Sequence, residues 1–116
     1  MRRQVSTRLK EDELAPCMHL AEFLPRAVPV RIPVQVARIG GTGFTGSEET
    51  VIEFGTPAEV LFASGLPLEF EDTVQIRTAD GSLDVKAEIV AVQVHQGKTA
   101  VAARFLHEVS NWIIRQ

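Results

Sequence analysis

The sequence predicts an all-β fold, a barrel or a sandwich of about six short antiparallel strands. Apolar and polar residues alternate over several short stretches, which is typical of strands with one face in a core and the other in water. Turns that contain glycine separate these stretches. The chain has 116 residues, of which 45% are hydrophobic and 23% charged, so we expect one globular domain with its own core.

Residues 28–36, VPVRIPVQV, form the clearest strand pattern in the chain. The even-numbered residues are all valine or isoleucine and share one face. Pro29 and Pro33 lie on the other face, and proline cannot donate a backbone hydrogen bond to a neighbouring strand. We therefore expect an edge strand, or a strand with one flank left unpaired. Residues 40–46 follow with four glycines and predict a hairpin loop.

Residues 50–63, TVIEFGTPAEVLFA, predict two short strands separated by a kink at Gly55-Thr56-Pro57. The strands on either side are rich in branched apolar residues. Residues 73–78, TVQIRT, alternate again and predict another strand. The dipeptide Asp80-Gly81 that follows is a strong signal for a tight turn.

Residues 83–94 predict a long strand in which the alternation slips by one residue at Ile89-Val90. Such a slip predicts a bulge that bends the strand, as closure of a barrel requires. Residues 99–105 alternate once more and predict the last strand of the sheet.

Short helical segments are expected at both ends of the chain. Residues 11–24 can form a short helix, because Pro16 fits the first turn and Pro25 would end it. Three apolar residues near the C-terminus have helical spacing: Val109, Trp112 and Ile113. They would let residues 106–116 form a short helix or turn that plugs the open end of the sheet.

The sequence divides into residues 1–21, a basic tail with a short helix, and residues 22–116, the barrel domain. The first ten residues carry four cations and no acid, so the remainder has seven more acids than bases. An acidic body argues against binding of a nucleic-acid polymer, which needs a basic face. No apolar run approaches the ~20 residues of a membrane-spanning helix.

Catalytic and metal-binding patterns are missing from the sequence. Cys17 is the single cysteine and no export signal is present, so the expected compartment is the cytoplasm. The histidines are scattered without metal-ligand spacing: His19, His95 and His107. The acidic residues Glu69, Glu71 and Asp72 are expected in a solvated turn, where a catalytic carboxylate pair would lack burial. We therefore expect no enzyme, no metal site and no cofactor.

From about Glu22 to Asn111 the order of these elements resembles the PilZ domain family, small six-stranded barrels that bind cyclic di-GMP. Several segments carry the resemblance, in this order: PVQV, the glycine-rich hairpin, a Thr before a kinked strand, Leu-Pro-Leu, VQIRT, VKAEIVAVQV and AARFL. The resemblance implies an all-β, six-stranded antiparallel PilZ-like barrel with short helical N-terminal and C-terminal segments. It also implies a regulatory role in bacterial signalling.

In this family an Arg-x-x-x-Arg segment before the first strand holds the ligand. Guanidinium groups suit cyclic di-GMP because they can fork onto phosphate, pair with a guanine edge or stack on the base. Arg26 stands at the second arginine of this pattern, whereas Glu22 stands at the first. Arg31 either supplies the missing charge or is a polar-face residue of the strand.

The second family motif, Asp/Asn-x-Ser-x-x-Gly, lies at the second strand and its turn. The corresponding positions here are Ile52, Phe54 and Pro57, none of which offers the polar group that the motif supplies. Gly55 still provides a turn, two residues early.

The resemblance therefore implies a PilZ-type regulatory binding module with weak or lost cyclic di-GMP binding, in which Arg26 and Arg31 are the candidate ligand contacts. The alternative is a ligand-independent protein–protein interaction adaptor. It would dock a protein partner through strand 28–36 or through the C-terminal tail.

Overall fold

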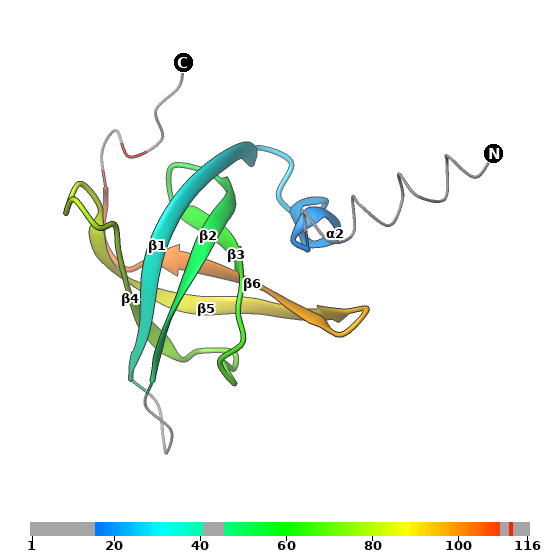
Figure 1. Ribbon diagram of the computed structural model, residues 1–116. Helices are drawn as coiled ribbons and strands as arrows, with labels where there is room; N and C mark the ends of the chain where they lie inside the picture. Colours follow the sequence, from blue (N-terminus) through cyan, green and yellow to red (C-terminus); the bar gives the residue numbers. More distant parts are fainter. Residues whose placement is uncertain (1–15, 41–45, 110–111, 113–116) are drawn as a thin grey trace.

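In the computed structural model, six antiparallel strands close into a barrel in the order β1-β2-β3-β6-β5-β4 (Figure 1). The structure describes residues 16–40, 46–109 and 112. The strands are β1 (Val28–Gly40), β2 (Ser47–Gly55), β3 (Glu59–Ala63), β4 (Thr73–Arg77), β5 (Asp84–His95) and β6 (Lys98–Phe105), and the helix α2 (Met18–Ala21) precedes them. The predicted all-β, six-stranded antiparallel barrel is confirmed.

β1 has a neighbour on each side, but not along its whole length. β2 pairs with residues 28–37, whereas β4 pairs only with residues 35–40. Arg38 donates its backbone N–H to the carbonyl of Gly46 on the β2 side at 2.9 Å. Because backbone groups alternate along a strand, Pro33 turns its nitrogen toward the flank that β4 leaves open. Of the two expectations for this strand, the partly unpaired flank is correct and the edge strand is wrong.

The pairing register shifts at several places in the barrel, and two of these shifts, in β5 and β2, bear on the sequence predictions. The register of β5 against β6 shifts between Ile89 and Ala91, which confirms the predicted slip in this strand. The register of β2 against β3 shifts between Ile52 and Phe54. As a result Ile52 packs in the barrel interior, whereas Phe54 packs against a cluster outside it.

Trp112 closes one end of the barrel core. It is buried, and its ring lies edge-on to Phe105 with the centroids 5.6 Å apart. Val109 packs partly buried against the same core. The expected plug is confirmed for Val109 and Trp112, while Ile113 lies outside the described residues. The predicted C-terminal helix is not found in residues 106–109 and 112, and the rest of that segment, residues 110–111 and 113–116, lies outside the described residues.

A second apolar cluster lies outside the barrel, beneath α2. Cys17 and Leu20 pack against outward-facing residues of the wall: Leu61, Ala100 and Ala102. Figure 1 shows α2 beside the barrel rather than across an end. The helix is shorter than the predicted segment 11–24, and the part before residue 16 is not among the described residues. No described helix is long and apolar enough to cross a membrane.

Arg38 and Asp72 form an ion pair that is almost fully buried. Alternate residues of β1 point into the barrel, and Arg38 continues this series. Its Nε and Nη2 donate to the two carboxylate oxygens of Asp72 at 3.0 and 3.3 Å. The backbone N–H of Glu69 also donates to this carboxylate, at 2.8 Å. The prediction that Asp72 lies in a solvated turn is therefore wrong. The hydrogen bond from Arg38 holds the pKa of Asp72 below its ordinary value of 3.8.

We expect Asp72→Asn to lower the free energy of unfolding at pH 7 by about 3 kcal/mol, because it removes the negative charge that accepts two hydrogen bonds from Arg38 in a buried pair. The pKa of Asp72 is lower in the folded than in the unfolded protein. The stability that ionised Asp72 adds to the folded protein is therefore complete above about pH 4 and is lost as the pH falls through the folded pKa. Urea unfolding at pH 7 and at about pH 3 should show the difference between variant and parent narrowing in acid.

The matched control is Asp84→Asn. Asp84 lies 3.7 Å from Arg77, and both side chains are about half exposed. Such a pair contributes about 0–1 kcal/mol. An equal loss of stability in both variants would contradict the role given to the buried pair.

Candidate functional site

A hollow of about 460 Å³ lies between the segment that leads into β1 and the β2–β3 turn. Its lining residues come from these two segments only: Leu24, Pro25, Arg26, Thr56, Pro57, Ala58 and Glu59. The structure therefore brings Arg26 to the Gly55-Thr56-Pro57 kink, from a distant part of the sequence. We call this the Arg26 hollow.

The side chain of Thr56 organises the turn. Its hydroxyl accepts hydrogen bonds from the backbone N–H groups of Ala58 and Glu59 at 3.1 and 2.9 Å. The same hydroxyl donates to Glu59 Oε1 at 3.0 Å. Behind the turn, the indole N–H of Trp112 donates to the Thr56 carbonyl at 2.9 Å. These contacts hold one wall of the hollow in a single conformation.

Glu59 carries a negative charge into the Arg26 hollow. It pairs in register with Arg104 of β6, and its Oε2 accepts from Arg104 Nε and Nη2 at 3.3 and 3.2 Å. The Glu59 side chain is 16% exposed and that of Arg104 is 57% exposed. Sequence reasoning missed both residues, since only the pairing of β3 with β6 places them side by side.

Arg31 does not line the Arg26 hollow. It lies on β1, exposed, where it interacts electrostatically with Glu53 of β2. Burial raises the pKa of Glu53, and a hydrogen bond from the Cys17 backbone N–H at 3.0 Å and the charge of Arg31 oppose that shift. Burial and the neighbouring Glu53 charge raise the pKa of the Cys17 thiol. The two arginines that sequence reasoning grouped together thus face different surroundings.

Of the three residues compared with the second motif, Ile52 and Phe54 pack away from the Arg26 hollow. Ile52 is fully buried in the barrel core, and Phe54 packs against the cluster beneath α2. Pro57 is exposed and lines the hollow. Packing therefore explains why Ile52 and Phe54 are apolar, because each lies in an apolar cluster of the fold.

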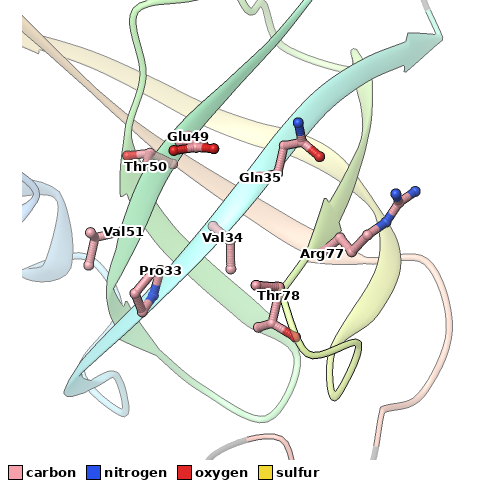
Figure 2. Close-up of a pocket in the computed structure, with 9 residues that line it drawn as sticks. Pro33, Val34, Gln35, Glu49, Thr50, Val51, Arg77 and Thr78 are labelled. Carbon is pink, nitrogen blue, oxygen red and sulfur yellow. The ribbon is translucent and has the colours of Figure 1, made fainter.

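A larger hollow of about 580 Å³ lies over the open flank of β1. Figure 2 shows its side chains on β1, on β2 and at the end of β4: Pro33, Val34, Gln35, Glu49, Thr50, Val51, Arg77 and Thr78. Its arginine, Arg77, already faces Asp84 at 3.7 Å. Neither predicted ligand residue lies here. Among the residues that the structure describes, no group of three potential metal ligands occurs.

No family model matches the sequence, and no curated protein matches it. Among solved structures the chain is similar to the inhibitor of motility MotI/DgrA from Bacillus subtilis, with a TM-score of 0.55 and 7% sequence identity. The match covers 72% of this chain and 42% of that one, so the chain spans less than half of its length. At this identity the likeness concerns the fold alone, and it is consistent with a PilZ-like barrel.

Gly55→Ala tests how closely the Trp112 ring packs against the β2–β3 turn. A Cβ at this position would lie 2.4 Å from Trp112 Cη2, so the indole has to move and its hydrogen bond to Thr56 weakens. We expect a loss of about 2 kcal/mol in the free energy of unfolding. The emission of Trp112, the single tryptophan, should shift to longer wavelength as the ring becomes wetter. Chemical denaturation followed by fluorescence measures both effects.

Gly65→Ala is the control, because a Cβ there meets Glu48 Oε1 at an ordinary 3.4 Å. It should leave the emission unchanged. Unchanged emission in Gly55→Ala as well would show that Trp112 does not lie against Gly55.

Proposed function

We propose that this chain is a PilZ-like regulatory module that binds cyclic di-GMP weakly in the Arg26 hollow. The observation that carries the proposal is the position of Arg26 across from the β2–β3 turn on a six-stranded barrel. The family pattern places its second arginine and its ligand-binding turn in these same two segments. The proposed role is regulatory rather than catalytic, and the proposed compartment is the cytoplasm.

Weak binding is proposed because most of the family's polar groups have no counterpart here. One guanidinium can fork onto one phosphate, whereas cyclic di-GMP carries two. Glu22 replaces the other arginine, and Arg31 lies outside the hollow. Each missing charged hydrogen bond reduces binding by about 1.5–3 kcal/mol.

The alternative of a ligand-independent adaptor finds less support in the fold. A closed barrel has no true edge strand, and Pro33 removes a donor from the flank of β1 that stays open. In the C-terminal segment, Trp112 is buried in the chain's own core. We propose that the nucleotide modulates an interaction of this barrel with a partner protein.

Calorimetric titration of cyclic di-GMP into the full chain tests the proposal. We expect a dissociation constant of about 10–100 μM, which corresponds to a binding free energy of about −6.8 to −5.5 kcal/mol. Arg26→Ala should weaken binding by at least about tenfold, because it removes the cation from the hollow. Arg31→Ala removes the same charge from a site outside the hollow and should change the affinity by less than about twofold.

Two results would contradict this proposal. One is the absence of heat with ligand at about 1 mM, where a 100 μM dissociation constant would give near-saturation. The other is an equal effect of the Arg26 and Arg31 substitutions, which would point to overall charge rather than to the hollow.

A further inference from the structure

Glu59 lies in the same hollow as Arg26, and its carboxylate is held in place. Oε1 accepts from the Thr56 hydroxyl at 3.0 Å, and Oε2 accepts from Arg104 at 3.2 Å. The backbone N–H of Glu59 is itself bound to the Thr56 hydroxyl at 2.9 Å. The carboxylate cannot swing away from the turn without breaking contacts at both oxygens.

Arg104 lies on the other side of the same turn. It lines a neighbouring hollow of about 460 Å³ that shares Pro57 and Ala58 with the Arg26 hollow. Its side chain is more than half exposed, and its Nε and Nη2 both donate to Glu59 Oε2. Arg26 and Arg104 therefore flank the turn. Glu59 lines the same hollow as Arg26 and forms an ion pair with Arg104.

We propose that Glu59 determines which ligand charge this site accepts. Its carboxylate repels a second phosphate of the ligand, and its ion pair with Arg104 keeps that arginine from binding this phosphate. This inference rests on the proposed function, because it concerns the same hollow. A ligand phosphate beside Arg26 meets a fixed carboxylate within one small cavity, where water screens charge less than in bulk solution. The wild-type site thus discriminates against dianions, and the weak binding of cyclic di-GMP follows from Glu59 as well as from the missing arginine.

Glu59→Gln is the direct test, because glutamine keeps the shape and can still accept from the Thr56 hydroxyl. The substitution removes the negative charge and releases Arg104 toward the ligand. We expect cyclic di-GMP to bind at least about tenfold more tightly than to the parent, with a steeper fall in affinity as salt is raised. Arg104→Ala in the Glu59→Gln background should remove part of the gain. A misfolded variant cannot produce a gain in affinity.

Glu49→Gln is the matched control. Glu49 is an exposed carboxylate on β2 that lines the larger hollow of Figure 2, so its substitution changes the net charge equally at another place. We expect its effect on affinity to stay within about twofold. An equal gain in both variants would overturn the inference, because overall charge would then explain the result.

The remaining outcomes separate this inference from the proposed function. If the parent binds through Arg26 and Glu59→Gln binds no more tightly, the inference is wrong and the proposed function stands. If Glu59→Gln binds and the parent does not, the inference stands and the proposed function is wrong. If neither protein binds cyclic di-GMP at about 1 mM, both are overturned.

Discussion

The hydrogen bond from the Trp112 indole to the Thr56 carbonyl, at 2.9 Å, joins the barrel core to the candidate site. The aromatic ring that closes one end of the barrel also supports the β2–β3 turn from behind. Gly55 is required there because any side chain would collide with the ring. On the outer side of the same turn, Thr56 positions Glu59 and the Arg26 hollow. The shape of the hollow thus depends on how the core is packed.

Two ion pairs of similar chemistry have different consequences in this barrel. Arg38 and Asp72 are nearly excluded from water, so breaking this buried pair destabilises the fold. Glu59 and Arg104 pair near the surface, and because the Arg104 side chain is more than half exposed, the pair contributes only about 0–1 kcal/mol to stability. The surface pair holds the Glu59 carboxylate beside the turn. Burial, rather than the distance between the charges, decides how much each pair contributes to stability.

The apolar residues at the second family motif contribute to packing. The bulge in β2 sends Ile52 into the core and Phe54 outward beneath α2. A polar residue at either place would reduce burial of apolar surface, by roughly 25 cal/mol for each Å² lost. Packing in this fold therefore accounts for both apolar side chains.

The alternation of residues, the turn dipeptides and the prolines were enough to predict the strands, the bulge near Ile89 and the plug at Trp112, because these are properties of neighbouring residues. The choice of a barrel came from resemblance. Tertiary structure alone decided the rest: an acidic turn became the site of a buried ion pair at Asp72, and closure of the barrel set Glu59 beside Arg104. It also placed Arg26 at the turn without Arg31. Contacts between charged residues that are distant in sequence leave no pattern among neighbouring residues. Their interaction energy depends on which strands become neighbours and on how much water remains between the charges.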